Sequence, residues 1–112
     1  MTKVNILGTK YDVLFQKESE NSKLETANGL CEYYSKKLIV NDHEHDNSHF
    51  ENMDAFKRRV LRHEITHAFL AESGLRGNCD WADNEEMVDW IAIQLPKMYK
   101  ACIEAHAIEE GD

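Results

Sequence analysis

The sequence predicts an α+β domain in which a small N-terminal antiparallel sheet precedes two helices. Up to about residue 40, short runs rich in β-branched and aromatic residues alternate with polar stretches, which is typical of short strands. From about residue 50 onward, apolar residues recur every three or four positions, which is typical of amphipathic helices. The chain has 112 residues and no linker-like segment, so we expect one domain over residues 1–112.

The N-terminal half contains four candidate strands. They are VNILG at 4–8, YDVLF at 11–15, LCEYY at 30–34 and KLIV at 37–40. Gly8 separates the first two, and the polar segment 16–29 is expected to be a surface loop. The last two are expected to form a hairpin around Ser35 and Lys36, with the inward positions Cys31, Tyr33, Leu38 and Val40.

Two helices are expected in the C-terminal half. Ser48 with Glu51 has the form of a capping box for the first helix, and Gly74 is a suitable terminator. Asp83 with Glu86 fits a second capping box. Pro96 should kink or interrupt the second helix, because proline lacks the amide donor and clashes with the preceding turn. Trp81 and Trp90 are expected to be core aromatics beside this helix.

Composition argues against several classes of protein. The formal net charge of −8 and the pI near 5.2 disfavour a nucleic-acid or anionic-membrane surface. The N-terminus has no signal-peptide pattern and no apolar run has the length of a membrane span, so a cytoplasmic location is expected. The three widely spaced cysteines are expected to be reduced thiols.

The stretch HEITH at 63–67 is the strongest chemical signal in the chain. On a helix, His63 and His67 share one face, so both imidazoles can bind one zinc ion. Glu64, one residue further round, can serve as the general base on a zinc-activated water. The structural alternative is a histidine pair with a salt-bridged glutamate and no metal.

The segment NEEMVD at 84–89 supplies a third zinc ligand. Glu85 is the preferred ligand, because it shares a helix face with Asp89, which could accept a hydrogen bond from a zinc-bound histidine. Glu86 is the alternative ligand. If Asp83 caps the helix, however, Glu86 serves the capping box instead.

HEITH followed by NEEMVD resembles the gluzincin metallopeptidases, in which HExxH is followed by NExxxD on a second helix. The matching residues are Asn84, Glu85 and Asp89. The short chain also resembles the minimal zincin domains of the ImmA/IrrE type, which occur in mobile elements such as prophages and in bacterial regulators. The resemblance is specific over residues 60–96 and architectural over the N-terminal half. It implies a zinc metallopeptidase that acts on a regulatory protein.

Several other residues are candidates for the site. Gluzincins stabilise the oxyanion of the transition state with a Tyr or His, and the candidates here are Tyr33, Tyr34, Tyr99 and His106. Cys79 could approach the zinc as an inhibitory ligand, although a structural thiol is the favoured interpretation. His43, His45 and His49 form a second cluster that we interpret as a polar loop.

The sequence thus predicts a zinc metallopeptidase that hydrolyses a peptide bond, with His63, His67 and Glu85 as zinc ligands and Glu64 as the base. The expected partner is a protein or peptide substrate, which in zincins lies in extended form along an edge strand. The KLIV segment is the candidate for that edge. The competing hypothesis is a zinc-binding regulatory or interaction module with the same fold and little or no protease activity.

Overall fold

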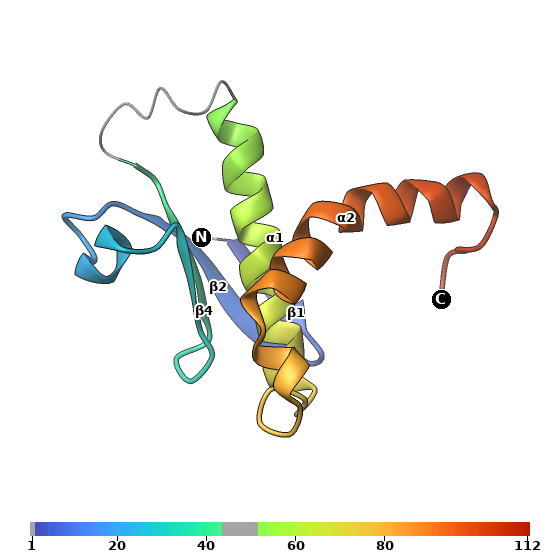
Figure 1. The fold of residues 1–112 in the computed structure, drawn as a ribbon, viewed down its shortest axis with the longest axis horizontal. Helices are drawn as coiled ribbons and strands as arrows, with labels where there is room; N and C mark the ends of the chain where they lie inside the picture. The colour runs from blue at the N-terminus through green and yellow to red at the C-terminus, as the bar shows by residue number, and fades with distance from the viewer. Residues whose placement is uncertain (1, 44–51) are drawn as a thin grey trace.

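The computed structural model describes residues 2–43 and 52–112. The strands are β1 (Thr2–Ile6), β2 (Thr9–Gln16), β3 (Gly29–Glu32) and β4 (Lys37–Asn41). The helices are α1 (Met53–Glu72) and α2 (Glu85–Glu104), with the short 3-10 turns η1 (Ser22–Glu25) and η2 (Asp80–Asp83). As Figure 1 shows, α1 lies across the sheet, and α2 begins beside α1 and then projects away from the rest of the chain. The predicted α+β class, with a sheet followed by two helices, is confirmed.

The sheet is mixed, which differs from the antiparallel sheet expected. Its strand order is β1-β2-β4-β3, and the central pair β2 and β4 is parallel. The KLIV segment belongs to β4 and lies inside the sheet, so its prediction as the edge strand is wrong. The physical reason is its composition: Leu38, Ile39 and Val40 are all buried, and a continuous apolar run is typical of a central strand. The edge on this side is β3.

Two hairpins contribute the antiparallel pairs of the sheet. In the β1–β2 hairpin, Leu7 and Gly8 both have positive φ, as a tight two-residue hairpin turn requires. The predicted β3–β4 hairpin around Ser35 and Lys36 is confirmed. The loop before β3 is held by Asn41, whose side-chain amide donates to the carbonyl oxygens of Leu24 and Ala27. This loop is therefore fixed to the sheet.

The main core lies between the sheet and α1. It consists of the buried side chains Ile6, Tyr11, Val13, Leu38 and Ala68, with Val4, Cys31, Tyr33, Leu61 and Ile65 packed against them. A smaller cluster of Leu70, Ala82 and Val88 joins α1, η2 and α2. The core therefore fixes α1 against the sheet, and the smaller cluster fixes the first half of α2 against α1.

The helix α1 begins after Asn52, whose side chain accepts a hydrogen bond from the Ala55 amide. The predicted capping box of Ser48 and Glu51 lies outside the described residues. At the other end Gly74 has a φ of 82°, which agrees with its predicted role as a left-handed terminator.

The helix α2 is capped by Asn84, whose side chain accepts from the Met87 amide, so the predicted cap at Asp83 is wrong by one residue. The helix continues past Pro96, although proline donates no backbone hydrogen bond there, and Figure 1 shows that the helix changes direction along its length. Trp81 and Trp90 are about half exposed, so their prediction as core residues is wrong. Past Pro96 the large apolar side chains Met98, Tyr99 and Ile103 are exposed. No described helix is long and apolar enough to cross a membrane.

Candidate metal centre

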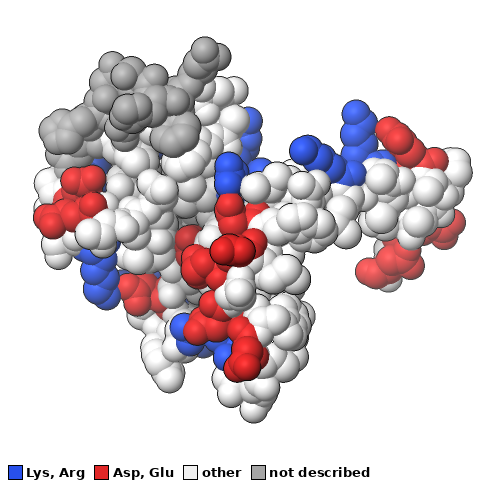
Figure 2. Space-filling view, viewed as in Figure 1, with Lys and Arg blue, Asp and Glu red and all other residues white. Residues whose placement is uncertain are grey.

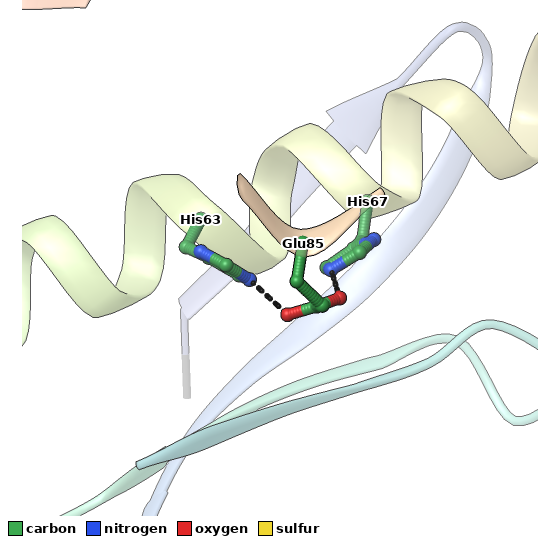
Figure 3. A group of neighbouring side chains, drawn as sticks. All are labelled: His63, His67 and Glu85. Atoms are coloured by element: carbon green, nitrogen blue, oxygen red, sulfur yellow. Dashed lines mark hydrogen bonds and ion pairs between the residues drawn. The ribbon is translucent and has the colours of Figure 1, made fainter. Parts of the chain in front are cut away.

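Three side chains converge where α1 meets the start of α2. The Nε2 atoms of His63 and His67 lie 3.0 Å and 2.7 Å from the two carboxylate oxygens of Glu85. Figure 3 shows the Glu85 carboxylate lying between the two rings. The possible ligand atoms of the three residues all lie within 4.8 Å of one another. The group that the sequence predicted is therefore brought together, and it could hold a metal ion.

The two helices place these side chains by simple geometry. His63 and His67 are four residues apart in the middle of α1, so they share one face. Glu85 is the first residue of α2, directly after the Asn84 cap. The smaller cluster of Leu70, Ala82 and Val88 holds α2 against α1 close to this point. The third residue of the group therefore depends on packing between the two helices.

Asp89 orients His63 from the second helix. Its Oδ1 lies 3.2 Å from Nδ1 of His63, and its Oδ2 accepts a 2.6 Å hydrogen bond from Arg59. The bond from Arg59 holds the pKa of Asp89 below its ordinary value, so the carboxylate is ionised and can accept a hydrogen bond from Nδ1 of His63. A proton on Nδ1 would leave Nε2 free to bind a metal ion beside Glu85. The predicted contact between Asp89 and a site histidine is therefore present.

Glu64 lies beside the group but is not a member of it. Its side chain is buried, and burial raises its pKa to about 7, an effect that nearby Glu85 adds to and His63 opposes. It packs against the backbone of Gly29 in β3, where an added Cβ would lie 3.0 Å from Oε2 of Glu64. A side chain at this position would thus press on the Glu64 carboxyl group, which glycine leaves in place against the edge strand.

The donor set fits a zinc ion. Two neutral imidazoles and one carboxylate form a common ligand set of catalytic zinc sites, which keep a further position open. Tetrahedral bonds of about 2.0–2.1 Å require ligand atoms roughly 3.4 Å apart. The observed contacts of 3.0 and 2.7 Å are shorter than this by about 0.4 and 0.7 Å, so the carboxylate would have to move back from the imidazoles to admit the ion. The Glu85 side chain is 70% exposed, so it has room to make that adjustment.

Two cavities meet at this site. One, of about 520 Å³, is lined by His63, Glu64 and Glu85 together with the loop before β3 and the first half of α1. The other, of about 200 Å³, is lined by His67, Glu64 and Glu85 together with β3 and Arg76. Gly29, Glu64 and Glu85 line both cavities, so the two lie next to each other along β3, and together they are called the cleft.

The surroundings of the site are acidic. Asp80, Asp83 and Glu86 are exposed next to Glu85 at the start of α2. Figure 2 shows acidic side chains gathered on this face near the start of α2. This charge attracts cations. Glu86, the alternative ligand suggested by the sequence, lines the larger cavity but does not belong to the group of His63, His67 and Glu85.

The remaining candidate residues lie in different parts of the structure. Tyr33 lines the smaller cavity, whereas Tyr34 is 89% exposed, Tyr99 lies on the projecting part of α2 and His106 lies beyond its end. Cys79 packs against the cluster of Leu70, Ala82 and Val88, as expected of a structural thiol. In the second histidine cluster, the His43 amide bonds to the Asn41 side chain, while His45 and His49 lie outside the described residues.

Sequence reasoning missed three residues of the site. Arg59 stands in a basic stretch with Lys57, Arg58 and Arg62 that is typical of a solvated helix face. Its spacing of four from His63 nevertheless places both residues on one side of the helix. In the sequence, Gly29 indicated only a turn. Nothing in the sequence indicated a role for Arg76, because its place beside His67 follows from the path of the loop between the helices.

No protein-family model, no curated protein and no solved structure matches the chain. The likeness to zincins therefore depends on the residues of the two motifs and on their arrangement around the cleft.

Proposed function

We propose that the chain is a zinc-dependent metallopeptidase, with His63, His67 and Glu85 as the zinc ligands. The observation that carries the proposal is the convergence of these side chains at a cleft that also contains the carboxyl group of Glu64. A purely structural zinc site is closed by four protein ligands, whereas this group offers three and lies against open cavities.

A zinc ion in this position would activate water and polarise the carbonyl group of the scissile peptide bond. Glu64 accepts the proton of the attacking water through its carboxylate and then gives it to the leaving amine. Gly29 leaves the Glu64 carboxyl group in the cleft, because position 29 has no side chain that would displace it. Asp89 and Arg59 keep the ring of His63 in the ligand orientation.

The substrate would lie as an extended strand along β3. The Asn41 amide donates to the Asn28 carbonyl just before β3 begins, and antiparallel pairs alternate between bonded and non-bonded positions. Gly29 and Cys31 then occupy non-bonded positions, so their backbone N–H and C=O groups point away from β4. These groups can pair with a peptide by β-strand addition, with the scissile bond next to Glu64.

The test compares Glu64→Gln with the matched variant Glu86→Gln, which changes the charge in the same cleft. Zinc content is measured by elemental analysis. Hydrolysis is measured by mass spectrometry after incubation with a mixture of unstructured peptides. We expect Glu64→Gln to keep the zinc and lose hydrolysis, because an amide cannot accept the proton, while Glu86→Gln keeps both. A wild-type chain that holds zinc but cleaves no peptide would instead support a zinc-binding regulatory module. Hydrolysis that survives in Glu64→Gln would remove the assigned base.

A further inference from the structure

The two ends of the cleft differ in chemistry. The larger cavity, on the His63 side, combines the apolar groups of Phe56, Val60 and Ala27 with Arg59, whose guanidinium is bound to Asp89. The smaller cavity, on the His67 side, contains Arg76 and Tyr33. Of the described residues that line this smaller cavity, Arg76 is the one with a permanent positive charge. A peptide that crosses the site therefore meets a guanidinium group in each cavity, but the one in the larger cavity is already bound by Asp89 at 2.6 Å.

Arg76 is held in position by aromatic and polar contacts. Its Nη1 donates a 2.6 Å hydrogen bond to the hydroxyl of Tyr33, and its guanidinium carbon lies 4.4 Å from the centre of the Tyr33 ring. A guanidinium that is held over an aromatic ring and also bonded to its hydroxyl has little freedom to turn, so its other N–H groups keep a restricted direction. The side chain is 35% exposed, and solvent or a ligand can therefore reach it.

The guanidinium of Arg76 already lies near a carboxylate. Its Nε is 3.4 Å from Oδ1 of Asp83, which is longer than the roughly 2.7–2.9 Å of a well-formed charge-assisted hydrogen bond. The Asp83 side chain is 60% exposed. A weak contact with an exposed partner is displaced easily, because such ion pairs contribute little to stability. The position of the Asp83 carboxylate thus shows where a carboxylate of a ligand can bind to Arg76 in its place.

We infer that Arg76 recognises a carboxylate of the substrate in the cavity beside His67. The inference rests on the proposed peptidase function and specifies the class of its substrates. The carboxylate is either the C-terminal carboxyl group of the peptide or the side chain of an Asp or Glu near the scissile bond. Both present the same pair of oxygens, which the planar guanidinium binds through two parallel N–H donors.

The experiment measures peptide binding without turnover. The full-length Glu64→Gln protein, loaded with zinc, is titrated into fluorescently labelled peptides of one common sequence, and the dissociation constant is read from anisotropy. One peptide has a free C-terminus and no acidic residue, a second is its C-terminal amide, and a third set consists of amides with a single Glu placed at each position in turn. The first and third forms distinguish the two sources of the carboxylate.

We expect the C-terminal acid, or one of the Glu-containing amides, to bind about 10- to 100-fold more tightly than the plain amide. Adding Arg76→Gln should abolish that difference. Arg76→Lys keeps the charge but loses the paired donors, so it should recover only part of the preference, and it serves as the second variant if Arg76→Gln fails to fold. Arg58→Gln is the matched control, because it removes an equal charge from an exposed position of α1 outside both cavities. Zinc content and the melting temperature of each variant separate a loss of recognition from a loss of folding.

Equal binding of acid and amide peptides would overturn the inference, and so would a carboxylate preference that survives in a folded Arg76→Gln protein. The two proposals fail separately. A preference that depends on Arg76, in a chain whose wild-type form cleaves no peptide, would reject the peptidase and keep the carboxylate site. Cleavage without any such preference would do the reverse.

Discussion

Gly29 of the edge strand lies directly against Glu64 of the first helix, and an ideal Cβ at position 29 would lie 3.0 Å from the Glu64 carboxylate. The same Cβ would lie 2.6 Å from a methyl group of Val60, a separation that real atoms do not sustain. The position of the proposed base and the absence of a side chain at position 29 are therefore linked.

Replacing Gly29 by Ala should harm both stability and activity. We expect the free energy of unfolding to fall by about 1–3 kcal/mol, the usual cost of overpacking, because Val60 is buried and cannot move aside freely. Displacement of the Glu64 carboxyl group should also lower the rate of peptide hydrolysis. Urea unfolding and an activity assay measure the two effects. Gly77→Ala is the control, since a Cβ there would meet nothing within 4 Å, and equal behaviour of the two variants would contradict the prediction.

Zinc affinity should rank three carboxylate variants in a fixed order. Glu85→Ala removes a proposed ligand and should be the most damaging, whereas Asp89→Ala removes the partner of His63 and should weaken binding about 10- to 100-fold. Glu86→Ala should change the affinity least. Competition for zinc against a chromogenic chelator measures all three. A ranking in which Glu86→Ala is worst would mean that the start of α2 turns a different face to the histidines.

The Asn84 cap of the second helix should contribute measurably to stability. Asn84→Ala should reduce the free energy of unfolding by about 1 kcal/mol, because the Met87 amide loses its acceptor. Asp83→Ala loses only a long, exposed ion pair with Arg76 and should have a much smaller effect. Denaturant unfolding with a chelator present excludes any contribution from zinc. A larger loss for Asp83→Ala would restore the cap that the sequence pattern favoured.

Glu72 should make stability depend on pH in the acid range. Its carboxylate accepts hydrogen bonds from Lys36, Tyr11 and Thr9, and these bonds lower its pKa from 4.5 to about 2. A lowered pKa in the folded state stabilises the fold fully above pH 4.5, and this contribution is lost as the pH falls toward 2. Wild type should therefore exceed Glu72→Gln in stability at pH 6 and approach it at pH 2.5. Unfolding by urea in the presence of a chelator checks this, with Glu110→Gln, beyond the end of α2, as the control. A difference that is constant with pH would contradict it.

Local patterns in the sequence predicted the elements well, because the spacing of apolar residues reports which face of a strand or helix is buried. The hairpin at Ser35 and Lys36 and the end of α1 at Gly74 are confirmed for this reason. The parallel pairing of β2 with β4 was not predictable, because it depends on which strands meet after the chain has folded. KLIV was assigned to an edge although its unbroken apolar run is better suited to the interior of a sheet.

The candidate site likewise contains residues that local sequence patterns predicted and residues that they did not. His63, His67 and Glu85 were found because their chemistry follows from residue type and helical spacing. Gly29 and Arg76 were not found, because each acts through a neighbour that is distant in the chain: Glu64 for the glycine and Tyr33 for the arginine. Such contacts have no local signature in a single sequence.

The projection of α2 past Pro96 divides one helix into two parts that should open on different time scales. The first part, with Val88 and Ala92 buried, can exchange its amide hydrogens with solvent only when α1 and α2 separate. The part from residue 97 onward is shorter than the roughly 12–15 residues that an isolated helix needs, and its apolar side chains are exposed, so it should fray from its C-terminal end at little cost in free energy. Amides at 99–104 should therefore exchange deuterium far sooner than those at 88–92. Binding of zinc, which would connect Glu85 to α1, should slow exchange in the first part and leave the second unchanged.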